Sequence, residues 1–135
     1  MKTKNTLRKS TLSGLLLLGA ITILFTAVPQ ASAAEVFVGQ WNNKKYKTKG
    51  TMTATLTKGQ GNNWSGVFTG VAIGKNYRFT ARFTEKTSSG KRMLVGNSNI
   101  DGSMYKWAAY IGARTLNGTY RAANGNNGNF SGRKR

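Results

Sequence analysis

The chain has 135 residues with no cysteine and no histidine, and 21 Lys and Arg against three acidic residues give a net charge of +18. Disulfides, zinc sites of the usual kind and Ser-His-Asp or Cys-His catalytic groups are therefore excluded. A glycosidase would need two paired carboxylates. We do not expect them, because Glu35 should lie near a frayed N-terminus and Asp101 in a turn. The composition predicts a non-enzymatic protein without a metal or other cofactor.

The first 33 residues have the order of parts found in an export signal. A basic start is followed by an apolar stretch from about Leu12 to Val28, then by Pro29 and by small residues at Ala31 and Ala33. We predict cleavage after Ala33, with the next residue as the alternative, and a secreted or periplasmic location for the product. The other interpretation is an uncleaved anchor, although about 17 apolar residues lie at the lower limit for crossing a bilayer. After cleavage no stable membrane span is expected.

Residues 34–135 are predicted to form a single domain that is itself basic. They contain 17 Lys and Arg and all three acids, a net charge of +14. A chain of this length can bury one small core. Without disulfides, its stability must come from packing and from hydrogen bonds between strands.

Apolar residues in this domain alternate with polar ones, a pattern typical of strands and not of helices. The clearest case is 51–57, where Met52, Ala54 and Leu56 share one face and threonines occupy the other. The segments 77–84 and 105–111 alternate in the same way. Eight strands are predicted, at residues 36–47, 50–58, 64–73, 77–86, 91–99, 103–111, 114–122 and 128–134.

The connections between these strands are all short. Asp101-Gly102 is a strong two-residue hairpin signal, because both residues tolerate positive φ. Longer turns are expected at residues 59–63, 74–76, 88–90 and 124–128. Short connections imply antiparallel neighbours, and closure would remove the exposed edges. We therefore predict an all-β fold, a small antiparallel up-and-down meander that closes into an eight-stranded barrel.

Three segments place glycine between two large residues on one face of a strand. They are Phe37-x-Gly39-x-Trp41, Trp64-x-Gly66-x-Phe68 and Leu116-x-Gly118-x-Tyr120. Glycine weakens a flat strand, but inside a narrow barrel it leaves room for a neighbouring side chain. The scheme favours a coiled, closed sheet.

The segment Gly39-Gln40-Trp41-Asn42-Asn43 resembles the Gly-x-Trp-x-Asn opening of avidins and streptavidins, and the glycine motifs at residues 64–68 and 116–120 are similar to later strands of that family. The resemblance, which extends to lipocalin-type barrels, runs loosely over most of the mature chain and implies a secreted eight-stranded barrel. It also implies a pocket in which Asn43 hydrogen-bonds a ligand and Trp64 and Trp107 form walls. The last strand lacks the Asp and Trp that biotin would need, so this part of the family pattern is missing.

Three classes of function are compatible with the sequence. In the leading hypothesis the basic exterior holds polyanions: an acidic polysaccharide, the anionic surface of the cell envelope, or extracellular nucleic acid. The alternative for the charge is that it only keeps the protein soluble. The residues predicted to bind polyanions are Lys44, Lys45, Lys47, Lys49, Arg78 and Arg82.

The second hypothesis is a barrel that binds a small ligand, with Trp41, Asn43, Trp64 and Trp107 as pocket residues. Eight strands can either hold one small molecule or be filled by their own side chains. A packed interior would exclude this function, and a cavity at one mouth lined by Trp41 and Asn43 would favour it. The third hypothesis is an envelope structural protein or an inhibitor, which the sequence neither supports nor excludes.

Overall fold

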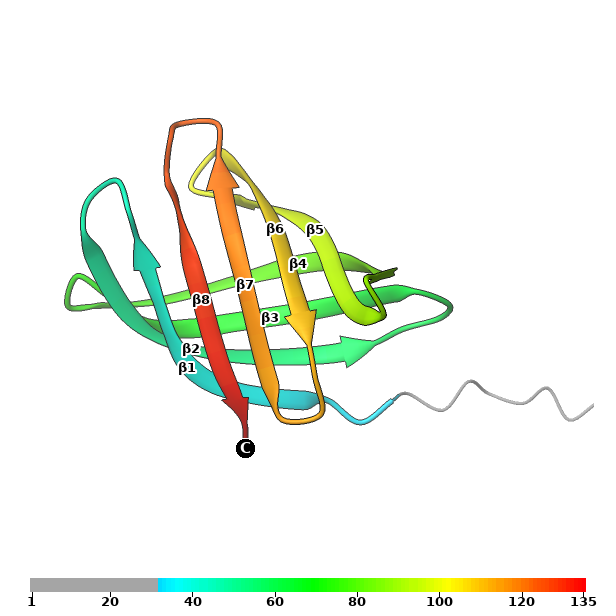
Figure 1. Cartoon of the computed structure of the whole chain (residues 1–135). Helices are drawn as coiled ribbons and strands as arrows, with labels where there is room; N and C mark the ends of the chain where they lie inside the picture. The colour runs from blue at the N-terminus through cyan, green and yellow to red at the C-terminus, as the bar shows by residue number, and fades with distance from the viewer. Residues whose placement is uncertain (1–31) are drawn as a thin grey trace, which may run out of the picture.

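The computed structural model describes residues 32–135, which form eight antiparallel strands closed into one barrel (Figure 1). Residues 1–31 of the predicted export signal lie outside the described part of the chain. Within residues 32–135 there is no helix long and apolar enough to cross a membrane. The strands are β1 (Glu35–Asn43), β2 (Thr48–Lys58), β3 (Asn63–Ala72), β4 (Lys75–Ser88), β5 (Lys91–Ile100), β6 (Ser103–Ile111), β7 (Thr115–Ala122) and β8 (Asn127–Lys134).

Each strand pairs with the next in sequence, and β1 pairs with β8. The predicted all-β meander and its closure are thus confirmed. Turns after β1, β3, β5 and β7 lie at one end of the barrel, which we call the mouth. Turns after β2, β4 and β6 lie at the other end, the base, together with the start of β1. In Figure 1 the mouth is at the upper left.

Several strand ends differ from the sequence prediction by one or two residues, and the end of the first strand differs by four. The first strand ends at Asn43, so residues 44–47 form a turn, in which Lys47 has a φ of 54°. The turn expected at 74–76 is instead Ile73-Gly74, with φ of 50° and 71°. A β-branched residue rarely adopts positive φ, so no local pattern predicted a turn at Ile73. The predicted turn at Asp101-Gly102 is confirmed, with φ of 50° and 80°.

The glycines within strands have two different roles. Gly66 has the predicted one, since a Cβ there would lie 2.9 Å from the Leu56 side chain and 3.2 Å from that of Phe83. Gly39 differs, because a Cβ at this position would run into the backbone of β8, where Gly39 pairs with Gly132. Glycine at this seam therefore lets the first and last strands close the sheet.

The core fills the middle and the base of the barrel. At its centre the ring of Phe68 stacks on Phe79 and Trp107, with centroids 5.1 and 5.8 Å away, and meets the edge of Phe130 at 6.3 Å. Phe68 is 2% exposed. Burial of such rings supplies most of the stabilisation available to a domain of this size.

The wall is incomplete towards the mouth. Strands β4 and β5 pair only from Arg82–Asn97 down to Ser88–Lys91, so residues 75–81 have no partner on the β5 side. The β3–β4 hairpin reaches out beyond its neighbours at the left of Figure 1. The barrel thus has a closed base and an open mouth with a lateral gap.

Candidate functional site

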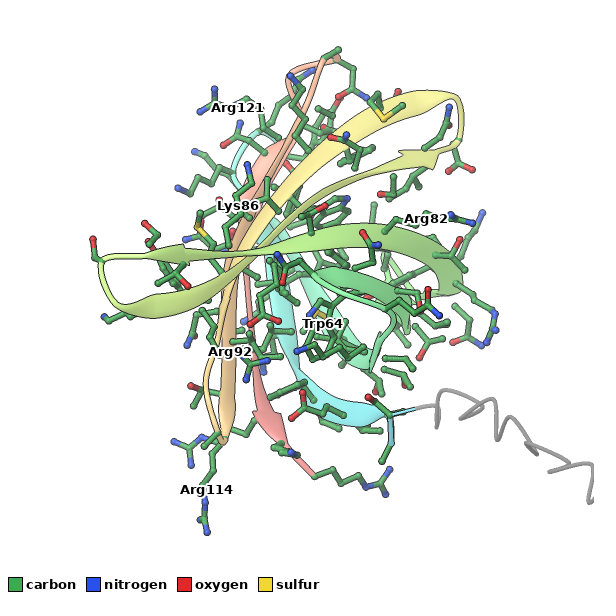
Figure 2. All side chains as sticks on the ribbon, turned by 90° about the vertical axis from the view of Figure 1, so that its right-hand side faces the viewer. Trp64, Arg82, Lys86, Arg92, Arg114 and Arg121 are labelled. Atoms are coloured by element: carbon green, nitrogen blue, oxygen red, sulfur yellow. The ribbon has the colours of Figure 1, made fainter. Side chains whose placement is uncertain are left out.

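The base of the barrel is closed by a set of polar and aromatic groups around Trp64. The indole N–H of Trp64 donates to a carboxylate oxygen of Glu85 at 2.8 Å, and Arg92 donates to the other oxygen at 2.8 Å. The Arg92 guanidinium also lies over the Trp64 ring, 5.7 Å from its centroid (Figure 2). The hydrogen bond from Arg92, and then that from Trp64, hold the pKa of Glu85 below its ordinary value.

The mouth holds a cavity of about 490 Å³. Its walls come from the inward faces of most strands and are mainly aromatic. A planar apolar molecule would meet ring faces and edges on several sides. The lining residues are Trp41, Asn43, Met52, Phe68, Ala72, Asn76, Tyr77, Arg78, Phe79, Ile100, Asp101, Tyr105, Trp107, Tyr120 and Phe130.

One polar group in this cavity is unusual. Within the described residues, the buried Trp41 indole nitrogen is the one buried side-chain N or O without a hydrogen-bond partner. Its ring meets Tyr77 edge-on, with centroids 6.4 Å apart. The Tyr77 hydroxyl donates to the Thr51 carbonyl at 2.9 Å. Burial raises the pKa of Tyr77 to about 12, and a hydrogen-bonding contact from the Trp41 side chain, too poorly aligned to count as a full hydrogen bond, acts in the opposite direction. A buried donor without an acceptor costs about 1–3 kcal/mol.

The rim of the cavity is fixed by a chain of amide and hydroxyl groups. Asn43 donates to the Asn126 side chain at 3.4 Å, and Asn126 donates to the Tyr105 hydroxyl at 2.9 Å. The Tyr120 hydroxyl donates to the Asn42 carbonyl at 2.6 Å. Burial, and after it Tyr105, raises the pKa of Tyr120 to about 12. These bonds connect the turn after β1 to the turn after β7 and hold Asn43 at the cavity wall.

The predicted pocket residues are only partly brought together. Trp41, Asn43 and Trp107 line the mouth cavity. Trp64 does not line it, because it lies at the base with Glu85. The sequence prediction missed Tyr77 and Tyr120 as lining residues, although the alternation in their strands already placed Tyr77 on the inner face.

The predicted polyanion residues do not form one cluster. Lys45 donates to the Asn124 carbonyl at 2.8 Å and so contacts the turn after β7. Lys47 lies in the turn after β1, and Lys49 lies opposite Asn42 in the β1–β2 register. The four lysines close in sequence are thus divided between a turn and the outer wall.

Arg78 and Arg82 are both exposed on β4, as the sequence predicted. Arg78 borders the mouth cavity. Arg82 is opposite Asn97 of β5, in a row that continues along the outer wall. The two arginines therefore belong to different surfaces.

That row follows the pairing of residues across five strands, from β4 to β8. Asn97 is opposite Lys106, Lys106 is opposite Arg121, and Arg121 is opposite Asn127. The amide of Lys44 donates to the Asn127 carbonyl at 2.8 Å, which adds Lys44 to the row. Sequence reasoning missed Lys106 and Arg121, because single cations on separate strands carry no local signal. We call this row the outer belt: Arg82, Asn97, Lys106, Arg121, Asn127 and Lys44.

Comparison with known proteins gives one match, to a solved structure. No protein-family model and no curated protein matches the sequence. The chain is similar to a de novo designed fluorescence-activating β-barrel, with a TM-score of 0.58 and 10% identity over 74% of this chain and 91% of the designed one. At this identity the likeness shows the barrel fold. It does not show the avidin or lipocalin family that the sequence motifs resemble.

Proposed function

We propose that this protein is a non-enzymatic binding protein that holds a small, largely apolar ligand in the mouth cavity. The observation that carries the proposal is the cavity itself, about 490 Å³ with aromatic walls and the unpartnered indole N–H of Trp41. Ligand cavities of roughly 300–1,000 Å³ are typical of proteins that enclose small molecules. The designed barrel of similar fold is described as fluorescence-activating, which is compatible with such a use of the fold.

The lining indicates the chemistry of the ligand. Stacked rings such as Tyr77 and Phe79, with centroids 5.8 Å apart, favour a flat apolar body. The Trp41 N–H is buried in the free protein, so it would donate to a carbonyl or ether oxygen of the ligand only after the ring turns towards the cavity. Charged groups at the cavity are restricted to Arg78 and Asp101, so a ligand without strong charge of its own suits the site.

A neutral fluorophore tests this proposal. N-phenyl-1-naphthylamine brightens in apolar surroundings and carries no charge that the basic surface could attract. We expect it to brighten on titration with the protein, and we expect Ala72→Trp, which fills the cavity, to weaken binding by about tenfold or more.

The matched control is Thr80→Trp, which adds the same side chain on the exposed face of the same hairpin. It should leave binding within about twofold. Unchanged binding by Ala72→Trp, or no brightening with the unaltered protein, would contradict the proposal.

The second candidate function is polyanion binding by the basic exterior. Within residues 32–135 the ion pairs involve only Lys58, Arg92 and Lys134, each with Glu85 or Glu35. The remaining cations have no acidic partner there. Their field attracts anionic polymers, and such binding weakens as salt rises because counterions are released. Export to the cell surface or medium, which the predicted signal implies, would bring the protein to such polymers.

A further inference from the structure

We propose that the outer wall formed by β4 to β8 and the end of β1 is a binding groove for an acidic polysaccharide. The inference rests on the proposed polyanion function and adds to it a location and a ligand class. Its elements are the outer belt and two shallow depressions beside it. Of the residues that the sequence predicted to bind polyanions, Lys44, Lys49 and Arg82 belong to this surface.

The belt places cations in a line. Neighbouring strands are about 4.8 Å apart, so positions from Arg82 to Lys44 extend over roughly 24 Å around the wall. Lys44, Lys106 and Arg121 border one depression of about 700 Å³. A row of this length fits several anionic groups of an extended chain, and not a single ion.

Within the belt, Lys106 and Arg121 are directly opposite each other on adjacent strands. Like charges in that position destabilise a sheet. Neither forms an ion pair with an acid of the described residues, since the pairs there involve other cations. A bound anion between the two would relieve the repulsion, so the pair is better suited to the bound state than to the free one.

The depressions have an uncharged floor. They share Ala108, Thr119 and Asn129, and the second, of about 750 Å³, continues towards β1 and β2. The lining includes the small residues Ala108, Gly118 and Gly128, together with exposed amide and hydroxyl groups. Such groups donate to and accept from sugar hydroxyls. The polar residues of the second depression are Gln40, Asn42, Lys49, Asn117, Thr119, Asn129 and Ser131.

The aromatic content of this wall favours a polysaccharide over a nucleic acid. Single-stranded nucleic acids bind by stacking successive bases on exposed aromatic rings. Along the strands of this wall Tyr110 is the exposed aromatic residue, at 44%, with Lys91 lying over its ring at 5.9 Å, while Tyr46, at 60%, lies beyond the belt in the turn after β1. One ring can pack against one sugar, but it makes a poor platform for a run of bases. Figure 2 shows Arg82 and Arg121 projecting outward from the barrel.

Titration of polygalacturonate, a polymer of uronic acids, over a series of salt concentrations tests the groove. We expect the double variant Lys106→Gln/Arg121→Gln to bind about tenfold more weakly and to lower the slope of log K against log salt by about one to two. Its thermal stability should be equal or higher, because the like-charged pair is gone. The matched control Arg133→Gln/Arg135→Gln removes the same charge near the base, and should lose less than about twofold in affinity.

A second pair of variants separates recognition of sugar from ion exchange. Asn117→Ala/Asn129→Ala should weaken binding by about threefold to tenfold while leaving the salt slope unchanged, since these amides contribute hydrogen bonds and not charge. Neutral dextran of equal length should not bind detectably, because it lacks the anionic groups.

Each contrary outcome has its own meaning. Equal losses in the two charge variants would overturn the groove while leaving polyanion binding intact. Tighter binding of oligothymidylate than of polygalacturonate would overturn the polysaccharide as ligand class. Failure of the unaltered protein to bind any polyanion would overturn the polyanion function and the groove together.

Discussion

The base and the mouth of the barrel use tryptophan in opposite ways. At the base, Trp64 is 5% exposed, donates to Glu85 and lies under Arg92. At the mouth, Trp41 is only partly buried, yet its indole nitrogen is buried and has no partner among the described residues. Between them, Trp107 donates to Ser98 at 2.6 Å.

This difference separates structural from functional polar groups. Hydrogen bonds to a charged acceptor contribute more than those to a neutral one, so the contacts of Trp64 stabilise a closed end. An unsatisfied donor lowers stability, and it is tolerated at Trp41 because the surrounding strands hold the ring. The comparison predicts that the base controls folding while the mouth controls binding.

The largest effect should come from removing each indole. We expect Trp64→Ala to lower the free energy of unfolding by about 3–5 kcal/mol, since it removes a buried ring and leaves Glu85 without one of its donors. Trp41→Ala should cost no more than about 2 kcal/mol, because part of that ring is in contact with solvent. Urea unfolding of the two variants measures the difference.

If Trp64→Ala does not fold, Trp64→Phe gives the same comparison at a smaller cost. Equal losses at the two positions would show that the mouth is packed as firmly as the base.

A smaller effect should follow from Glu85→Gln, and it should depend on pH. The folded-state pKa of Glu85 is lower than its ordinary value of 4.5. Its ion pair therefore stabilises the fold above that value, and the contribution is lost as the pH falls through the folded-state pKa. At neutral pH we expect the variant to be about 1 kcal/mol less stable. In acid, below the folded-state pKa, the difference should vanish.

Thermal unfolding at several pH values measures this effect. The control is Glu35→Gln, which removes an exposed ion pair with Lys134 and should cost less than about 0.5 kcal/mol at neutral pH. A Glu85→Gln penalty that stays constant down to low pH would mean that packing, not charge, is responsible.

The barrel could be predicted from the sequence because its signals are local. Alternation within strands and the Asp101-Gly102 turn act over a few residues, and together they specify eight strands and their order. Ile73 was missed since its positive φ is imposed by the hairpin, against the residue's own preference. The role of Gly39 was misjudged because it depends on Gly132 of β8, which lies 93 residues later.

The functional surfaces were harder to predict from the sequence than the fold. Trp41, Asn43 and Trp107 were predicted as pocket residues, but the inner face alone cannot distinguish the mouth from the base, and Trp64 was grouped with them. The outer belt depends on the register of five strands, which no local pattern gives. Lys106 and Arg121 are fifteen residues apart in sequence, yet they are opposite each other in the sheet.

The smallest change in stability, but the most informative for the comparison, is expected from Trp41→Phe. The variant keeps a ring at the cavity wall and removes the unpartnered N–H, so the protein should be as stable as before or more stable by up to about 1 kcal/mol. Trp64→Phe should be destabilising, because it removes a donor that has an acceptor.

If the Trp41 N–H donates to a ligand, a neutral probe with a carbonyl group should bind about tenfold more weakly to Trp41→Phe than to the unaltered protein. A suitable probe is the coumarin fluorophore 7-diethylamino-4-methylcoumarin. N-phenyl-1-naphthylamine, which has no carbonyl acceptor, should bind the two proteins about equally. A destabilised Trp41→Phe, or an equal loss for both probes, would show that the indole of Trp41 is needed for packing and not for hydrogen bonding to a ligand.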